Sequence, residues 1–262
     1  MQKLSDACVW LTGASSGIGE ALARELVSRG GRVAAFARRK ERLDRLRDEL
    51  GESLLVQVGD VTDRTRVKEA VAEAQEAFGR IDVAILNAGI GDSLLFDEFD
   101  VELIERTFAV NVMGVVYGME AVLPRMKERE SGTIVGMSSP AGFRGLPTSG
   151  AYCASKAALS TLFESLRVEA RAHGIKLLTV SPGFVKSEMT DRNDHPMPFL
   201  METDKAARII CDGIESGRRH IHFPWRLTVP LLFLRMLPVP LYDYLMRKYV
   251  VPRVKPKRKS ES

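Results

Sequence analysis

The regular alternation of short apolar runs with longer helical stretches is the feature that most constrains the fold of this chain. Between Val9 and Ser181, runs rich in β-branched residues alternate with amphipathic, charge-rich segments. Strands that alternate with helices build βαβ units, which require a parallel sheet with helices on both faces. A chain of 262 residues suffices for one such domain with a large core. We therefore predict a single α/β domain, a doubly wound parallel sheet in three α/β/α layers.

The order of the runs predicts the individual elements. Strands are expected at Val9–Thr12, Arg32–Ala37, Leu54–Val58, Ile81–Asn87, Thr133–Ser138 and Lys176–Ser181. Helices are expected at Gly17–Ser28, Arg39–Leu50, Arg64–Phe78, Val101–Lys127 and Gly150–His173. The domain predicted from this series spans residues 1–222, and residues 223–262 form a C-terminal extension.

The extension differs in composition from the domain. Its apolar segment, residues 223–250, contains Pro230 and Pro240. Each of them is expected to begin a short helix, because proline suits the first helical turn, and Pro238 is expected to end the first of the two. The basic tail, residues 251–262, is rich in Lys, Arg, Pro and Ser, which predicts disorder.

The positive charge of the chain is concentrated at its end. From Arg247 onward there are seven Lys or Arg and one Glu, a charge of +6, which leaves −2 on the rest because the whole chain carries +4. A nucleic-acid-binding enzyme spreads positive charge over a folded face and adds aromatic platforms. This distribution argues against a nucleic-acid partner.

Cysteine and histidine usage excludes two further classes of protein. The three cysteines, an odd number without close spacing, argue against a disulfide framework and favour a reducing cytoplasm. His220 and His222 would share one side of a strand, but no third ligand is near, so no metal site is expected. The N-terminus lacks the pattern of a signal peptide, and no run of about 20 uninterrupted apolar residues predicts a membrane span.

A glycine-rich turn links the first expected strand to the first expected helix. Glycines let the backbone turn sharply and approach a pyrophosphate, and the helix offers its unpaired N–H groups to the anion. A glycine cluster alone is a weak signal, but this one stands where a dinucleotide-binding fold needs it. The turn therefore predicts a Rossmann-like fold. The cofactor contacts expected from it are Gly13, Ser15, Ser16, Gly17, Ile18 and Gly19.

More cofactor contacts are expected where the third and fourth strands end at the same edge of the sheet. Asp60, followed by Val61, is placed to accept a hydrogen bond from an adenine amino group, with a helix N-cap as the alternative role. The fourth strand ends in Asn87, Ala88 and Gly89, and small residues there let a cofactor lie against the backbone.

The end of the second strand distinguishes between the two nicotinamide cofactors. A carboxylate there would bind the ribose hydroxyls of NAD and repel the extra phosphate of NADP. This strand ends instead in Arg38 and Arg39, and the planar fork of Arg38 suits a phosphate. A solvated helix start is the alternative, but we expect NADP(H) to be preferred over NAD(H).

Tyr152 and Lys156 stand four residues apart, which on a helix places both side chains on one face. A phenol has an unperturbed pKa of about 10, and a neighbouring ammonium is expected to lower it. The pair would then exchange a proton near neutral pH. Many helices carry such a pair on their surface, so by itself the pair is a weak signal.

Three other features accompany this pair. Ser139, just past the fifth strand, has a hydroxyl able to hold a carbonyl oxygen, and Ser138 is the alternative. Asn111 stands in the middle of an expected helix, where Asn is a poor helix former. A functional helix distortion that orders a water would explain it, and surface exposure is the alternative.

A turn follows the sixth strand. Its proline and glycine position the backbone to hold the nicotinamide amide. The contacts expected there are Pro182, Gly183, Val185 and Ser187.

These motifs, in this order and spacing, resemble those of the short-chain dehydrogenase/reductase family over roughly residues 5–190. The resemblance rests on TGASSGIG, NAG at 87–89, Asn111, Ser139, YCASK at 152–156 and the Pro-Gly turn. Two departures are minor: Leu86 replaces the first Asn of the common NNAG, and Ser187 replaces the usual Thr.

The resemblance implies an oxidoreductase that interconverts an alcohol and a ketone or aldehyde. Asn111, Ser139, Tyr152 and Lys156 would form its catalytic tetrad, with Tyr152 and Lys156 also contacting the cofactor, and Thr12 would be structural. The tyrosine would pass the proton, and Lys156, a water and Asn111 would relay it. The resemblance also implies a homodimer or homotetramer. A catalytically silent NADP-binding regulatory or scaffold protein is the alternative, and the intact tetrad argues against it.

The last third of the chain bears on the substrate. The segment from Glu188 to Asp204 contains three methionines, a Phe and a Leu, which predicts an apolar, adaptable pocket. Residues 225–250 have three competing interpretations: packing on the core or across a dimer, capping the pocket, or docking on a membrane surface together with the basic tail. The last would make a cytoplasmic enzyme peripheral to a membrane.

Overall fold

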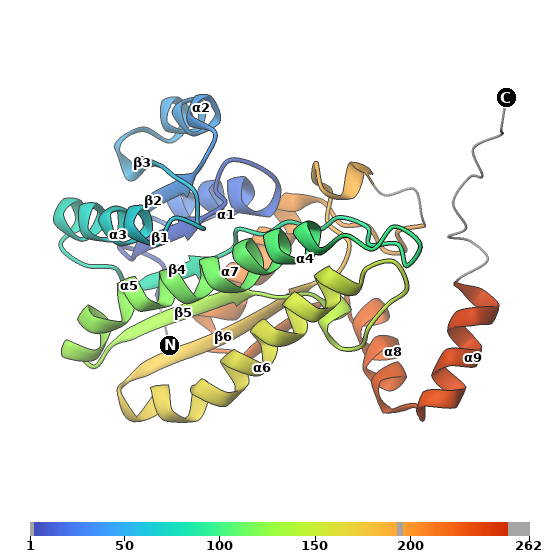
Figure 1. The fold of residues 1–262 in the computed structure, drawn as a ribbon. Helices are drawn as coiled ribbons and strands as arrows, with labels where there is room; N and C mark the ends of the chain where they lie inside the picture. The colour runs from blue at the N-terminus through green and yellow to red at the C-terminus, as the bar shows by residue number, and fades with distance from the viewer. Residues whose placement is uncertain (1–2, 193–195, 251–262) are drawn as a thin grey trace, which may run out of the picture.

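The computed structural model describes residues 3–192 and 196–250, and the predicted tail 251–262 lies outside them. Within these residues a parallel sheet has seven strands in the order β3-β2-β1-β4-β5-β6-β7 (Figure 1). The strands are β1 (Cys8–Thr12), β2 (Arg32–Ala37), β3 (Leu54–Val58), β4 (Val83–Leu86), β5 (Gly132–Met137), β6 (Ile175–Pro182) and β7 (His220–Phe223). The order reverses between β1 and β4, so the sheet is doubly wound, as predicted. Ligands of such sheets bind at the carboxyl ends of the strands beside this reversal.

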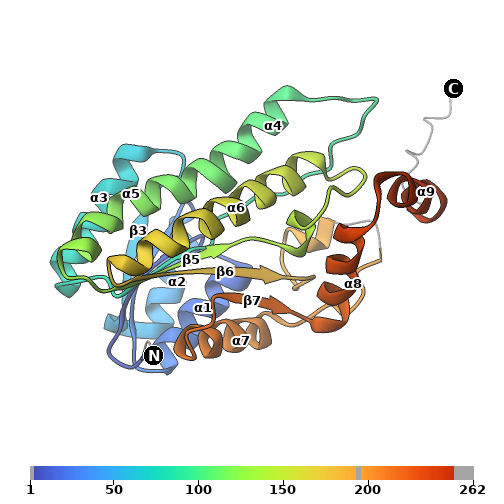
Figure 2. The ribbon, with the colours of Figure 1, turned by 90° about the horizontal axis from the view of Figure 1, so that it is seen from below.

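Helices cover both faces of the sheet, which gives the three predicted layers (Figure 2). The helices of the main domain are α1 (Gly17–Ser28), α2 (Lys40–Leu50), α3 (Arg64–Phe78), α4 (Val101–Phe108), α5 (Gly114–Glu128), α6 (Gly150–Ala172) and α7 (Thr203–Glu215). Helices α1, α2 and α7 bury apolar side chains on one face, and α3, α5 and α6 on the other. Adjacent residues of β1 serve both cores, since Val9 and Leu11 face the first and Trp10 the second.

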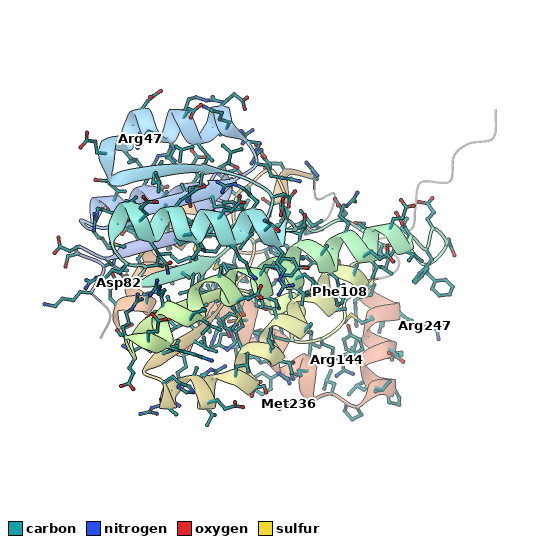
Figure 3. All side chains as sticks on the ribbon, turned by 60° about the vertical axis from the view of Figure 1, so that its left-hand side comes forward. Arg47, Asp82, Phe108, Arg144, Met236 and Arg247 are labelled. Atoms are coloured by element: carbon teal, nitrogen blue, oxygen red, sulfur yellow. The ribbon has the colours of Figure 1, made fainter. Side chains whose placement is uncertain are left out.

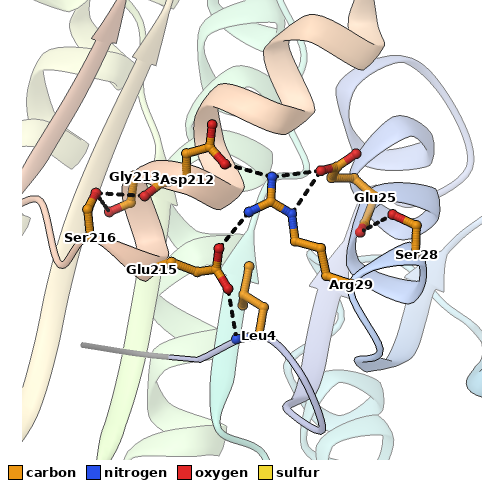
Figure 4. Close-up of polar contacts among 8 residues, drawn as sticks. All are labelled: Leu4, Glu25, Ser28, Arg29, Asp212, Gly213, Glu215 and Ser216. Carbon is orange, nitrogen blue, oxygen red and sulfur yellow. Dashed lines mark hydrogen bonds and ion pairs between the residues drawn. The ribbon is translucent and has the colours of Figure 1, made fainter.

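An arginine at the end of α1 connects three parts of the chain. Arg29 pairs with Glu25 on its own helix and with Asp212 and Glu215 on α7, each at 2.7 Å (Figure 4). Glu215 also accepts a hydrogen bond from the backbone N–H of Leu4 at 3.3 Å. These contacts hold α1 against α7 and therefore position the glycine-rich turn that precedes α1.

The C-terminal extension contains two helices, α8 (Trp225–Met236) and α9 (Val239–Tyr249), beyond the edge strand β7 (Figure 2). Arg144, in the loop between β5 and α6, donates to the backbone oxygens of Leu234 and Leu237 at 2.7 Å and stacks on the Tyr242 ring at 4.0 Å (Figure 3). The Tyr242 hydroxyl donates to the backbone oxygen of Gly145. The guanidinium thus adds hydrogen bonds to carbonyls at the end of α8, including that of Leu234, which also accepts the N–H of Leu237 at 3.3 Å. The extension is therefore packed on the loop that leads from β5 into the catalytic helix.

Most expected elements match the structure to within two residues. The fourth strand is shorter than Ile81–Asn87, because the N–H of Asn87 already turns to the Thr12 hydroxyl. The prediction that Pro230 begins a helix is wrong, since α8 begins at Trp225 directly after an extended Pro224. Pro240 does lie in the first turn of α9, and Pro238 follows the end of α8, as predicted. Phe223 is the last residue of β7. The domain boundary expected after residue 222 stays a prediction.

The long helical region expected at 101–127 is interrupted. A π-helical turn, Ala109–Met113, separates α4 from α5. The whole run, Val101–Glu128, is long and apolar enough by length and composition to cross a membrane, which the sequence analysis did not anticipate. In this fold it is a core helix, because Val115, Met119 and Val122 are buried against the sheet.

Candidate active site

The glycine-rich turn adopts a backbone that only glycine tolerates well. Gly13 and Gly17 have φ values of 69° and 55°, in the left-handed region. A Cβ on Gly19 would lie 2.1 Å from the backbone oxygen of Gly13, so the turn and the helix start can pack only without a side chain there. Ile18 packs partly buried against the core beside the turn.

The start of α1 suits an anion. The N-cap residue Ser16 makes no side-chain cap, because its hydroxyl accepts a hydrogen bond from Arg39 at 2.6 Å. The first N–H groups of the helix are therefore left for a ligand, as a pyrophosphate requires. The residues present thus fit the diphosphate of a dinucleotide cofactor.

Thr12 and Asn87 tie the ends of β1 and β4 together. The Thr12 hydroxyl accepts hydrogen bonds from the N–H groups of Asn87 and Ala88 at 2.9 and 3.1 Å. The Asn87 side chain donates back to the Thr12 carbonyl at 3.0 Å. Thr12 is therefore structural, and the side chain of Asn87, predicted as a cofactor contact, is engaged with the protein itself.

Gly89 lies against two residues of the tetrad predicted above, Asn111 and Lys156. A Cβ at this position would lie 3.2 Å from the Asn111 Oδ1 and 3.3 Å from the Lys156 Nζ. The backbone of the segment after β4 therefore runs directly against the two side chains.

Asp60 and Arg38 contact each other at the end of β3 and β2. The carboxylate accepts hydrogen bonds from the N–H and hydroxyl of Thr62, at 3.0 and 2.9 Å, and lies 3.5 Å from Arg38. The cap of α3 is the neighbouring Asp63, so Asp60 is not the cap. Val61 is buried and packs against Gly114.

Arg39, rather than Arg38, lies on the phosphate turn. Its guanidinium donates to the Ser15 and Ser16 hydroxyls at 3.2 and 2.6 Å and to Glu188 at 2.6 Å. Arg38 is 69% exposed. The phosphate site expected at the end of β2 stays a prediction, and of the two arginines Arg39 is the one that contacts the glycine-rich turn.

Tyr152 and Lys156 lie on one face of α6, as their spacing predicts, with the Lys156 Nζ 5.6 Å from the centre of the Tyr152 ring. Lys156 is 4% exposed and donates to the backbone oxygen of Met137 at 2.7 Å. Ser139 forms a side-chain hydrogen bond with the phenol. The structure therefore brings the hydroxyl, the phenol and the ammonium together at the carboxyl end of β5.

Burial controls the proton affinities of this pair. It lowers the pKa of Lys156 to about 8, because the charged ammonium is disfavoured away from water. It also raises the pKa of Tyr152, and only the hydrogen bond from Ser139 acts in the lowering direction. The expectation that Lys156 lowers the pKa of the phenol is thus not met, since desolvation of the phenol outweighs the favourable contacts. The tyrosine carries its proton at neutral pH.

Geometry separates the two candidate serines. The Ser138 hydroxyl donates to the backbone oxygen of Lys156 at 2.9 Å and contacts the Ser160 hydroxyl at 2.7 Å, so it braces α6. Ser139, whose hydroxyl also accepts the N–H of Ala141 at 3.2 Å, is the serine beside Tyr152.

Asn111 lies in the π-helical turn and is fully buried, so surface exposure does not explain it. Its side chain accepts the N–H of Ile90 at 2.8 Å and donates to the Ile90 carbonyl at 2.9 Å. It also donates to the Ser155 hydroxyl at 3.0 Å. The predicted helix distortion is confirmed. In this structure the Asn111 side chain positions the segment after β4 against the catalytic helix, and a role in ordering water stays a prediction.

The turn after β6 connects the site to the extension. Pro182 ends β6. Gly183 donates its N–H to the backbone oxygen of Phe223 at 2.7 Å. A Cβ on Gly183 would lie 2.7 Å from the side chain of Leu227 in α8. Val185 is buried. Ser187 bonds to Thr190 and lines a surface pocket together with Gly17 and Glu188.

One apolar residue of the expected pocket lies beside Gly91, as Tyr152 does. A Cβ on Gly91 would lie 3.0 Å from the Tyr152 ring and 3.6 Å from the Met189 sulfur. Met201 instead packs on the core and pairs with Val185. Met197 interacts with another part of the protein. Residues 193–195 lie outside the described part of the chain.

Comparison with known proteins decides the family. The model of the short chain dehydrogenase family matches residues 7–197, most of the chain. This protein belongs to the short-chain dehydrogenase family. It is an NAD(P)-dependent oxidoreductase.

Relatives of this short-chain dehydrogenase agree with the assignment. A Myxococcus xanthus protein named only as an oxidoreductase is 42% identical over 251 residues, 95% of this chain and 99% of its own. One from Staphylococcus saprophyticus is 37% identical over 194 residues, 73% of this chain and 79% of its own.

Two solved structures share the fold. A short-chain dehydrogenase/reductase from Burkholderia phymatum, in complex with NAD, has a TM-score of 0.82 and 25% identity, covering 88% of this chain and 93% of its own. A short-chain dehydrogenase from Streptomyces avermitilis has a TM-score of 0.80 and 29% identity, covering 94% and 98%.

Sequence reasoning missed three residues near the site of this short-chain dehydrogenase. Arg42 and Glu188 form an ion pair at the phosphate turn, and Arg144 holds the extension. The spacing of Arg39 and Arg42, one helical turn apart, signals a shared face. No local pattern indicates that Glu188, 146 positions after Arg42, reaches them.

Proposed function

We propose that this enzyme uses NADP(H) to interconvert an alcohol and a ketone or aldehyde of an apolar substrate. The observation that carries the reaction is the convergence of Ser139, Tyr152 and Lys156 at the carboxyl edge of the sheet. The bound nicotinamide would supply or accept the hydride. The side chains of the protein would supply the proton and hold the substrate oxygen.

The protonated phenol of Tyr152 is suited to donate to a carbonyl oxygen, and Ser139 is placed to hold that oxygen beside it. The buried Lys156, whose pKa of about 8 lies below that of the phenol, would return a proton to Tyr152 once the phenol has donated its own. Acid–base catalysis of this kind contributes about 10²–10⁴-fold to a rate.

The cofactor preference rests on the end of β2. In place of a ribose-binding carboxylate there are guanidinium groups, with Arg39 on the serines of the phosphate turn. The apolar character of the substrate rests on Met189 beside the Tyr152 ring, and on Phe199 and Leu200, exposed in the same segment.

A reductase screen over aldehydes, ketones and lipid-like carbonyl compounds, with NADPH and with NADH, tests the proposal. We expect kcat/KM to be higher with NADPH, and equal or better efficiency with NADH would contradict the preference. Tyr152→Phe is expected to bind cofactor normally and to lose about 10²–10⁴-fold in kcat. A Phe variant that turns over at the normal rate would remove Tyr152 from the mechanism.

We also propose a cytoplasmic homodimer or homotetramer that contacts anionic membranes peripherally. Its three thiols are all free and buried, which suits a reducing compartment. Trp225, Val229, Phe233 and Met236 lie exposed along one face of α8, and the chain continues into its basic tail.

Sedimentation equilibrium and flotation with anionic vesicles test these two proposals. A monomer would contradict the first. We expect vesicle binding to fall when Phe233 and Met236 are both replaced by Ser, and absence of binding by the full chain would contradict the second.

A further inference from the structure

A short segment after β6 crosses the glycine-rich turn. A Cβ on Gly17 would lie 3.1 Å from the Cβ of Ser187, so the two backbones are close together. The next residue, Glu188, reaches α2, where its carboxylate accepts from Arg39 at 2.6 Å and pairs with Arg42. This segment therefore connects the loops that follow β1, β2 and β6.

The partners of Glu188 form an anion site. Arg39 keeps two of its nitrogens on the Ser15 and Ser16 hydroxyls while the third serves Glu188. Guanidinium forks and hydroxyls are also the groups that bind phosphate monoesters. The side chains of Arg39, Arg42 and Glu188 are 39%, 37% and 45% exposed, so an ion in solution has access to the site.

The carboxylate is held there in its charged form. Hydrogen bonds from Arg39 and Arg42 lower the pKa of Glu188, and the positive charges of the two arginines lower it further. At neutral pH the site thus already contains one negative charge supplied by the protein.

We propose that Glu188 determines cofactor specificity by occupying the site of the cofactor 2′-phosphate and competing with it for Arg39 and Arg42. The inference rests on the proposed use of NADP(H). A phosphate monoester carries a charge of about −1.5 to −2 at neutral pH, so it is repelled by the carboxylate. The two anions also compete for the same guanidinium N–H groups of Arg39 and Arg42. The 2′-hydroxyl of NAD(H) is uncharged and leaves the ion pairs intact. Glu188 therefore weakens the binding of NADP(H) selectively and reduces the preference that the arginines create.

Calorimetric titration of the full chain with adenosine 2′,5′-bisphosphate and with 5′-AMP tests this without turnover. Glu188→Gln is expected to tighten bisphosphate binding about 3- to 30-fold, the scale of one or two charge-assisted contacts. Its affinity for 5′-AMP is expected to change less than about two-fold, since that ligand lacks the 2′-phosphate.

Asp44→Asn is the matched control. Asp44 lies on α2, the helix that carries Arg42. Its substitution removes one negative charge and one exposed ion pair, that with Lys40 at 2.6 Å. We expect it to change neither affinity by more than about two-fold. In an Arg42→Met background, the gain from Glu188→Gln is expected to shrink, because one of the two contested donors is gone.

An unchanged or weaker affinity of Glu188→Gln for the bisphosphate overturns the proposal, and so does an equal gain in Asp44→Asn. The proposed cofactor preference fails separately, when the wild-type chain binds 5′-AMP as tightly as the bisphosphate. The role of Glu188 is judged only on the change that its own substitution causes.

Discussion

Replacing Thr12 with valine removes one hydroxyl and keeps the shape of the side chain. That hydroxyl accepts the N–H groups of Asn87 and Ala88 at 2.9 and 3.1 Å, and Thr12 is 2% exposed. Valine leaves the N–H of Ala88 unpaired and leaves that of Asn87 with only the Ile85 carbonyl, at 3.1 Å, and an unpaired buried donor costs about 1–3 kcal/mol. Since Asn87 and Ala88 are only half-buried, we expect the free energy of unfolding to fall by about 2 kcal/mol in total. In a chain of this size that lowers Tm by about 4 °C.

Reversible urea unfolding, followed by fluorescence of the buried Trp10, measures this loss. Thr12→Ser is the control, because it keeps the acceptor oxygen and removes one methyl group, a loss of about 1 kcal/mol. The valine variant is expected to be the less stable of the two. The reasoning is refuted when valine is tolerated as well as threonine, or when serine costs as much as valine.

Three other predictions concern the site and the extension. Arg144→Met loses the donor to the carbonyls at the end of α8, so we expect faster proteolysis in residues 239–249; unchanged cleavage would contradict it. Because burial depresses the pKa of Lys156 to about 8, the unfolded chain binds more protons between about pH 8 and 10.5. The stability of the wild type relative to Lys156→Met should therefore rise by about 3 kcal/mol across that window in urea titrations, and a constant difference would contradict the burial argument. Gly19→Ala, whose Cβ would meet the Gly13 oxygen at 2.1 Å, is expected to weaken NADPH binding at least about ten-fold in fluorescence titrations; normal affinity would show that the turn adapts.

The elements of this fold were predictable because their signals are local. A parallel strand is buried on both faces and appears as a continuous apolar run, such as Cys8–Thr12, all of whose residues are buried. Helix ends carry their own markers, such as Asp63, which caps α3. Pro230 misled the prediction, because proline restricts a helix without showing whether it lies at the first turn or beyond it.

The amino-acid sequence by itself determined the parallel α/β architecture and the glycine turn, since periodicity and short spacings encode them. The residues Asn111, Ser139, Tyr152 and Lys156 came from the resemblance of its motifs to those of the family. Only the tertiary structure decided that Ser139 and not Ser138 faces the phenol, that Asn111 clamps Ile90, and that burial raises the pKa of Tyr152. It also decided that Glu188 reaches Arg39 and Arg42 across the phosphate turn. The physical reason is that pKa values and ion pairs depend on desolvation and on contacts between residues far apart in the chain, which no local pattern records.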